Sequence, residues 1–312
     1  MTSDLKHPHQ LFRAASGADL VAMAEAAGVG LAALIDTLVQ PHPGGERPPT
    51  LVVGSIADGT ATASSDLDLL VLVDSFDRLR PPAGQVWLDS GSTLEVLQYL
   101  NGVEVNVSFV SRSSLAPVTD SLVRVAPALY DPRTLGAIPL IHEGDLRVAH
   151  RLRTGWPLWG DDQVERWRDE CLVALLPQYL TIRHLVELAE FSEDAEALIG
   201  SVPGSMGLAA RIAVQHGVLA LLAHQGFTGQ NHKWIIHWAG RVERPSVRAL
   251  AVRGCEMVLA AAPLTEHDER RCLGELRSFR AQVSEELSTD PELRSAIEHF
   301  AEAIEYVTKE AP

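Results

Sequence analysis

Two apolar runs, separated by small and polar residues, dominate the pattern early in the chain. Residues 51–53 (LVV) form the first run and residues 69–73 (LLVLV) the second, and Gly54-Ser55 directly follows the first run. Short apolar runs bounded by turn residues are typical of buried strands. The pattern over residues 51–74 therefore predicts a strand, a glycine turn, a short helix and a second strand.

Asp66 and Asp68 come at the start of the second predicted strand. On an extended strand, residues two apart share a face, so both carboxylates point one way while Leu67 and Leu69 point into a core. Two adjacent carboxylates repel each other unless a cation neutralises them. Mg²⁺ is such a cation, because it binds one or two protein carboxylates and fills its other positions with water and substrate phosphates. The alternative is an ordinary solvated aspartate pair at a strand end.

Gly54 and Ser55 precede this pair at the end of the first predicted strand. A glycine lets a ligand approach the backbone closely, because it has no Cβ. Ser55 is expected at a helix N-terminus, where free N–H groups and the helix dipole favour phosphate. The turn is thus a candidate phosphate site beside a candidate metal site.

A hairpin is predicted for residues 93–110, where two alternating runs surround Asn101-Gly102. This dipeptide favours a two-residue type I′ turn. In the second run the valines and Phe109 share one face, and the opposite face carries Glu104, Asn106 and Ser108. We expect this polar face to lie beside the strand of Asp66 and Asp68.

From about Trp156 onward strand-like runs are absent and Ala, Leu and Glu dominate, so the second half is predicted to be a helical bundle, with a kink at Pro177. Helices are expected at 205–225, 231–241, 246–261, 266–286 and 291–309, with earlier short helices within 16–40. The expected fold class is α+β: an N-terminal mixed-sheet domain, residues 1–150, followed by an all-α domain, residues 151–312.

The composition indicates which partners and which cellular location to expect for the protein. The chain has 312 residues, enough for two cores, and no run of eighteen apolar residues, so no membrane span or membrane partner is expected. Its start lacks an apolar signal core, and three scattered cysteines fit reduced thiols in a cytoplasmic protein. The net charge of −15 argues against a nucleic-acid partner and favours a cationic small molecule.

The motif pair Gly54-Ser55 and Asp66-Leu67-Asp68, about ten residues apart, resembles the signature of the nucleotidyltransferase superfamily, which has a DNA-polymerase-β-like fold. The likeness is greatest to the aminoglycoside adenylyltransferases with a helical C-terminal domain. Those enzymes have a third carboxylate, a glutamate, within an apolar run on a neighbouring strand, and Val103-Glu104-Val105 matches it. Glu95, on the other strand of the hairpin, is the competitor, and an exposed structural role for Glu104 is the alternative.

The resemblance implies a Mg²⁺-dependent nucleotidyltransferase whose catalytic domain is residues 1–150 and whose helical domain, residues 151–312, binds the acceptor. Asp66, Asp68 and Glu104 would be its catalytic residues and metal ligands. Gly54 and Ser55 would hold the triphosphate of an NTP, with ATP the first choice as co-substrate. A two-metal site is expected, since two ions stabilise both the attacking and the leaving oxygen. Glu104 could also accept the proton of the acceptor hydroxyl.

Lys233 completes the predicted nucleotide site, because a lysine-tryptophan pair also opens a helix in the C-terminal domain of several small-molecule nucleotidyltransferases. A solvated lysine beside a core tryptophan is the equal alternative. The expected product is a nucleotidylated small molecule, such as an aminoglycoside-like antibiotic or a biosynthetic intermediate, together with pyrophosphate. Two other functions stay open: nucleotidylation of a protein, and a non-catalytic nucleotide-sensing module.

Overall fold

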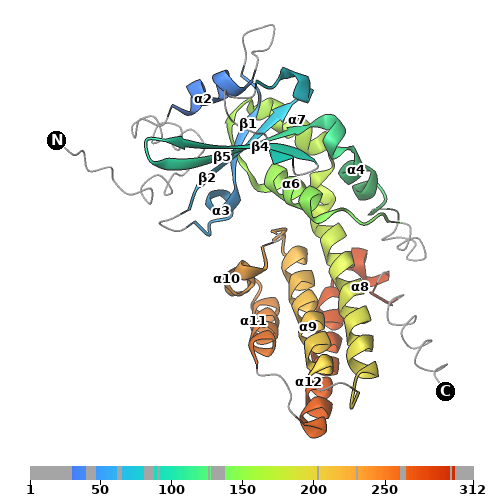
Figure 1. The fold of residues 1–312 in the computed structure, drawn as a ribbon. Helices are drawn as coiled ribbons and strands as arrows, with labels where there is room; N and C mark the ends of the chain where they lie inside the picture. The colour runs from blue at the N-terminus through green and yellow to red at the C-terminus, as the bar shows by residue number, and fades with distance from the viewer. Residues whose placement is uncertain are drawn as a thin grey trace. The chain divides into compact units, whose positions relative to one another are not determined.

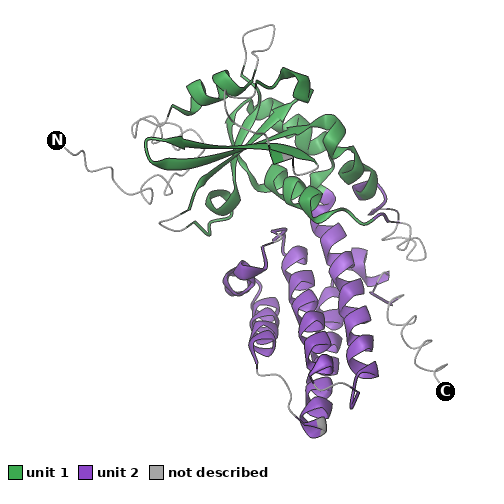
Figure 2. Cartoon of the chain, in the orientation of Figure 1, with its two compact units in different colours: residues 1–121, 140–174 green, residues 122–139, 175–312 purple. Residues whose placement is uncertain are grey.

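The computed structural model describes residues 30–39, 47–61, 65–80, 88–89, 92–125, 127, 138–201, 204–229, 231–260, 265–295 and 297–298 (Figure 1). The chain divides into two compact units, which Figure 2 shows in different colours. The first comprises residues 1–121 and 140–174, and the second comprises residues 122–139 and 175–312. The first unit holds a sheet and the second is helical, so the predicted α+β class is confirmed.

The described strands of the first unit form a six-stranded sheet in the order β3-β4-β5-β2-β1-β6. Their bounds are β1 (Thr50–Val53), β2 (Leu67–Val73), β3 (Leu88–Asp89), β4 (Thr93–Leu100), β5 (Val103–Ser111) and β6 (Trp156–Trp159). β2 and β5 pair in parallel, whereas the other neighbours are antiparallel. The sheet is therefore mixed, and the parallel pair brings the starts of β2 and β5 to the same edge.

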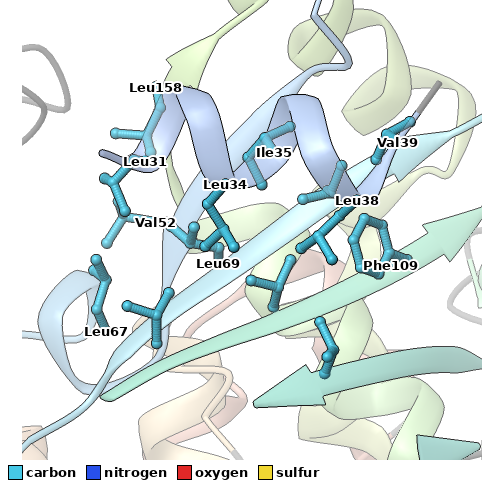
Figure 3. Close-up of a cluster of buried hydrophobic side chains, with 14 of the residues drawn as sticks. Leu31, Leu34, Ile35, Leu38, Val39, Val52, Leu67, Leu69, Phe109 and Leu158 are labelled. Atoms are coloured by element: carbon cyan, nitrogen blue, oxygen red, sulfur yellow. The ribbon is translucent and has the colours of Figure 1, made fainter. Parts of the chain in front are cut away.

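One face of the sheet is buried against α2 (Leu31–Leu38), as Figure 3 shows. Leu31, Leu34, Ile35 and Leu38 recur at helical spacing and all point to the sheet. From the sheet side, the alternate residues of β2 and β5 meet them, among them Leu69 and Phe109, which are fully buried. These alternate residues are the ones that the sequence assigned to the core, so the polar residues between them are left on the opposite face.

The hairpin between β4 and β5 has the turn that its sequence predicts. Asn101 and Gly102 both have positive φ angles, 51° and 83°. Positive φ at both central residues is the mark of a type I′ turn, whose twist matches that of the flanking strands. The turn fixes the register, which pairs Tyr99 with Glu104 and Glu95 with Ser108.

The division of the chain differs from the expected boundary after residue 150. That boundary falls inside α6 (Glu143–Thr154), and β6, from Trp156 to Trp159, pairs with β1. The first unit thus continues through α7 (Asp161–Glu170) to residue 174. Its other helices are α3 (Gly54–Ala57) and α4 (Arg112–Leu122). The expectation that strands end before Trp156 was wrong, because a strand of four residues that includes a proline gives little periodic signal.

The second unit consists of helices that pack on the central α9 (Ser205–His224). The others are α8 (Leu176–Ala197), the short turn η5 (His232–Trp234), α10 (Ile235–Arg241), α11 (Pro245–Leu259) and α12 (Glu266–Leu287). By length and composition alone α9 could cross a bilayer, but 72% of its most apolar window is buried within the protein, as in a core helix. Beyond α12, most of the helix expected at 291–309 lies outside the described residues, as do residues 16–29.

Pro177 does not kink a helix. It lies in the first turn of α8, where a proline is tolerated because its missing N–H has no intrahelical acceptor. The break lies instead before α8, where Leu172 has a positive φ of 54°. The three cysteines are free thiols, and Cys171 and Cys255 are buried.

Candidate active site

Asp66 and Asp68 lie at the edge of the sheet where β2 begins. Asp66 immediately precedes β2, and Asp68 is its second residue, opposite Val53 at the end of β1. Leu67 between them is buried in the core. The aspartates consequently share the opposite face of the sheet, as their spacing predicts.

Gly54 follows β1 directly and packs against the side chain of Asp68. A Cβ built on Gly54 would lie 2.1 Å from Oδ2 of Asp68, which is far inside van der Waals contact. Its φ of 69° is in the left-handed region, which side chains other than glycine's adopt only at a cost. The position thus needs glycine for two reasons: the backbone turns sharply into α3 here, and the carboxylate of Asp68 fills the space of a side chain.

Asn106 connects the two aspartates from the neighbouring strand. In the parallel register it is the partner of Asp68, and its Nδ2 donates a hydrogen bond to Oδ2 of Asp66. A hydrogen bond to Asn106 also stabilises the ionised form of Asp68. The sequence placed Asn106 on the polar face but gave it no role, because an asparagine within a strand is a weak signal.

Arg151 of α6 is a site residue that the sequence did not indicate. Its guanidinium lies over the sheet, with Nη2 3.8 Å from Oδ1 of Asp68, and Nη1 donates to Oγ of Ser108 at 3.1 Å. The Arg151 side chain is only 17% exposed, so its charge acts in a partly desolvated place. Ser108 in turn donates to Oε1 of Glu95 at 3.3 Å. The helix thus brings a cation to the edge where the carboxylates lie.

Glu95 and Glu104 are both on the polar face, but they have different partners. Oε2 of Glu104 accepts a hydrogen bond from the hydroxyl of Tyr99 at 2.9 Å. Glu95 belongs to the charges that act on Asp68. Glu104 is on β5, the immediate neighbour of β2, whereas Glu95 is one strand further away. The structure therefore keeps both glutamates as candidates for the third carboxylate.

The environment of Asp68 opposes its negative charge. Burial raises its pKa to about 6, and the carboxylates of Asp66 and Glu95 add to this, while Arg151 and the bond from Asn106 oppose it. A cation placed between Asp66 and Asp68 would relieve the repulsion. The raised pKa of Asp68 thus indicates a site where binding of a cation is favourable.

A divalent cation fits Asp66 and Asp68 as a two-carboxylate site, the usual protein contribution to Mg²⁺ binding. Among the residues that the structure describes, no group of three or more His, Cys, Asp or Glu side chains could hold a metal ion. The two-metal arrangement with Glu104 stays a prediction. The donors present, carboxylate oxygens with an amide and backbone nearby, are hard ligands suited to Mg²⁺ rather than to softer metals.

Asp58 and His150 tie the glycine turn to α6. Nε2 of His150 lies 3.1 Å from Oδ1 of Asp58, which directly follows α3. His150 is 7% exposed and is adjacent to Arg151 in the chain. This contact fixes the position of α3, which begins at Gly54, relative to α6, which carries Arg151.

The remaining predicted nucleotide-binding residues are Ser55 and Lys233. Ser55 is in α3, which has only four residues, so a phosphate at this turn would meet backbone N–H groups rather than the dipole of a long helix. Lys233 belongs to the second unit, in η5, where the side chain of Asn231 accepts a hydrogen bond from the Lys233 N–H. Its Nζ lies 5.3 Å from the centroid of the Trp234 ring.

Comparison with known proteins finds a matching family model and similar solved structures. Residues 50–124 match the family model described as nucleotidyltransferase domain. A solved structure of a nucleotidyltransferase-like protein from Exiguobacterium sibiricum 255-15 is similar over 92% of this chain and 91% of its own, with 12% sequence identity and a TM-score of 0.44. No curated protein matches this chain.

The matched segment runs from β1 to the end of α4 and includes Gly54, Asp66, Asp68 and both candidate glutamates. It leaves out Arg151 and all of helices α8 to α12. The match supports the nucleotidyltransferase superfamily for residues 50–124, the part of the chain that carries the carboxylate site.

Proposed function

We propose that the protein is a Mg²⁺-dependent nucleotidyltransferase that moves a nucleoside monophosphate, AMP from ATP in the first instance, to a hydroxyl of a small cationic molecule. An aminoglycoside-like antibiotic or a biosynthetic intermediate is the expected acceptor. The observation that carries the proposal is the packing of Gly54 against Asp68 beside Asp66, within a segment that matches a nucleotidyltransferase domain. This packing supports the proposal because the turn that would bind phosphate lies against the carboxylates that would bind the cation.

In this proposal, the N–H groups of the turn after β1 bind the phosphates, and Asp66 and Asp68 hold the metal ion. Bound Mg²⁺ would neutralise charge on the triphosphate and on the departing pyrophosphate. The acceptor oxygen attacks the α-phosphorus, and the bond from that phosphorus to the bridging oxygen of the β-phosphate breaks. Glu104 takes the hydroxyl proton, with Glu95 as the competing base.

Positioning and charge carry the rate of such a transfer, since little covalent chemistry falls to the protein. The hydrogen bonds of Asn106 orient Asp66 and Asp68, and Arg151 holds Ser108 and Asp68 in place from α6. Lys233 binds the β- and γ-phosphates. The acidic surplus of the chain, −15, favours cationic acceptors through long-range attraction.

The test follows pyrophosphate release from the whole protein with Mg²⁺ and each NTP, with and without a panel of aminoglycosides. Release that depends on a small acceptor supports the proposal. A labelled protein in place of a labelled small molecule would instead indicate nucleotidylation of a protein. Tight NTP binding without any turnover would indicate a nucleotide-sensing module.

Variants assign the roles. Asp66→Asn and Asp68→Asn should each lower turnover by at least about a thousandfold with the fold intact, because charge neutralisation is lost. Glu104→Gln should keep NTP affinity and lose turnover about a hundredfold, the contribution of a general base. If Glu95→Gln shows that loss and Glu104→Gln does not, Glu95 is the base.

Tyr99→Phe is the matched control for the glutamate, since it removes only the hydroxyl that binds Glu104. It should change turnover by no more than about tenfold if Glu104 acts as a base, and it should leave NTP affinity unchanged. Lys233→Met should weaken NTP binding about tenfold or more, the effect of losing one charged hydrogen bond.

A further inference from the structure

The helical unit contains a cavity of about 580 Å³ that the carboxylate site does not use. It lies between α9, α11 and α12, and all of its lining residues belong to the second unit. This volume is in the range of sites for small organic ligands. It could not be predicted from the sequence, because its walls come from three separate helices.

The cavity lies beside a close contact of the same three helices. At Gly254 of α11, between the lining residues Arg253 and Glu256, a Cβ would lie 2.4 Å from Cγ2 of Val218 and 2.8 Å from Cζ of Phe279. Beyond this contact, small residues of α9, Gly207 and Ala210, line the cavity in place of a large side chain. The space is thus bounded by well-packed helices.

Apolar side chains form much of the cavity wall. Val214 of α9, Met257 of α11 and Leu276 of α12 line it, and both Val214 and Leu276 are buried. Methionine adapts its shape to different ligands, because its side chain is unbranched and flexible. Such a wall suits the apolar body of a ligand.

Two guanidinium groups give the cavity its chemical preference. Arg211 and Arg253 line it and are half-buried. Each donates to a neutral group: Arg211 to the carbonyl of Ala260, and Arg253 to Oε1 of Gln282 at 3.1 Å. Within the described part of the chain, neither forms an ion pair with a carboxylate.

The acidic residues of the lining do not cancel this preference. Asp268 already pairs with Arg271, at 3.4 Å, and Glu256 and Glu275 are exposed to solvent. A half-buried cation without a counter-charge is poorly solvated, so an anion that reaches it gains more than it would at the surface. Arginine also binds carboxylate and phosphate with two parallel hydrogen bonds.

We propose that this cavity binds an amphipathic organic anion: an apolar body carrying one carboxylate, sulfonate or phosphate. The body lies against Val214, Met257 and Leu276, and the anionic group is held by Arg211 and Arg253. The site is independent of the carboxylate site of the first unit, and it binds a ligand of opposite charge to the expected acceptor.

Cys272 provides a local reporter, since it lines the cavity and is half-buried, whereas Cys171 and Cys255 are buried. The experiment uses the full chain and three probes with linear apolar chains of nine or ten carbons, below their micellar concentration or solubility limit: decanoate, decan-1-ol and decyltrimethylammonium. The alkylation rate of each cysteine by iodoacetamide is followed by mass spectrometry, and affinities are measured by calorimetry.

Decanoate should bind at least about tenfold more tightly than the other two probes, the contribution of a charged hydrogen bond, and should slow alkylation of Cys272. The double variant R211Q/R253Q should lose this preference. Arg248→Gln, which removes an exposed arginine of α11 outside the cavity, should keep it.

Equal protection of Cys272 by all three probes would overturn the anion assignment, and so would stronger binding of the cationic probe. Failure of decanoate to bind or to protect Cys272 in the unmodified protein would overturn the site itself. That comparison needs no variant, so it holds even if R211Q/R253Q does not fold. Circular dichroism of each variant confirms the helical fold.

Discussion

At the scale of single residues, Gly54 combines a backbone angle that favours glycine with close packing against a candidate metal ligand, Asp68. In Gly54→Ala the new methyl group would lie only 2.1 Å from Oδ2 of Asp68, so the carboxylate must move. The alanine must also adopt a φ of 69°. The φ alone costs about 1–2 kcal/mol of unfolding free energy. The displaced carboxylate should in addition lower pyrophosphate release at least about a hundredfold, since a shift of this size removes a ligand from its place.

Gly102→Ala separates these two effects. Gly102 has a similar φ, 83°, but a Cβ on it would meet nothing within 4 Å. It should lose about 1–2 kcal/mol in denaturant unfolding and keep its turnover. If both variants keep turnover equally, position 54 needs glycine only for its backbone angle. The proposed role of the close packing between Gly54 and Asp68 is then wrong.

Asp68 yields a prediction about stability and pH. Its pKa in the folded protein, about 6, lies above the ordinary value of 3.8, so the folded state keeps the proton to higher pH than the unfolded state does. The unfolding free energy therefore falls as pH rises from 4 to 6. Above pH 6 it stays at the lower value, because the carboxylate is then ionised in both states. Asp68→Asn should raise the unfolding free energy of the first unit at pH 8 by roughly 2–3 kcal/mol.

Denaturant unfolding of the metal-free protein at pH 8 and at pH 4 measures this gain, which should nearly vanish at pH 4. Asp74→Asn is the control, because Asp74 follows the other end of β2 and is 64% exposed, and it should change stability by less than about 0.5 kcal/mol. A loss of stability in Asp68→Asn at pH 8 would contradict the view that the site holds unfavourable charge.

At the scale of elements, the sequence predicted those that have a strong local signal. The alternation in β5 and the Asn101-Gly102 turn follow from side-chain spacing, and helices α9 to α12 follow from a composition rich in Ala, Leu and Glu. Each of these elements is present. β6 was missed because a four-residue strand with a proline has no readable period. Its place beside β1 is decided by tertiary pairing.

The same distinction applies to the site. Gly54, Asp66 and Asp68 could be found from the sequence because one turn and one strand bring them together. Arg151 could not, since it reaches the site from a helix more than eighty residues further along the chain. The Asn101-Gly102 turn fixes the register that pairs Tyr99 with Glu104, but the hydrogen bond between their side chains depends on rotamers that the sequence does not show.

The contact between α8 and α9 contains a pair of histidines that should make the helical unit sensitive to acid. Nδ1 of His184 lies 3.1 Å from Nδ1 of His216, and His184 is 5% exposed. Burial and the neighbouring charges of Arg183 and His232 lower both pKa values, that of His216 to about 4. The pair is therefore neutral in the folded protein at neutral pH.

The unfolded chain binds these protons near pH 6.5 and the folded unit does not, so stability is lost as pH falls from 6.5 to 4. The loss from His216 alone should be about 3 kcal/mol, because its pKa in the folded unit is about 4. In His216→Gln the thermal midpoint should fall less steeply over this range. His267→Gln, at an exposed site of α12, should keep the wild-type slope. Equal slopes in the two variants would show that other groups control the acid sensitivity.

At the scale of the whole molecule, the two units have separate cores, and this predicts where the chain can be cut. The main apolar cluster of the sheet uses residues 31–158 only, and the first unit ends at residue 174. A fragment of residues 1–174 should therefore fold by itself. A fragment of residues 1–150 should not, because it cuts α6 and lacks β6, whose pairing covers the edge of β1.

Heteronuclear NMR of both fragments tests this, with dispersed amide signals expected only for residues 1–174. The folded fragment also separates the roles of the units. It keeps Asp66, Asp68 and the Gly54 turn, so it should still bind Mg²⁺ with ATP, and it should lose turnover and show the weaker ATP affinity of Lys233→Met. If it transfers AMP to an acceptor as fast as the full chain, the acceptor and phosphate contacts assigned to the helical unit are wrong. If residues 1–150 fold equally well, β6 is not part of the stable sheet.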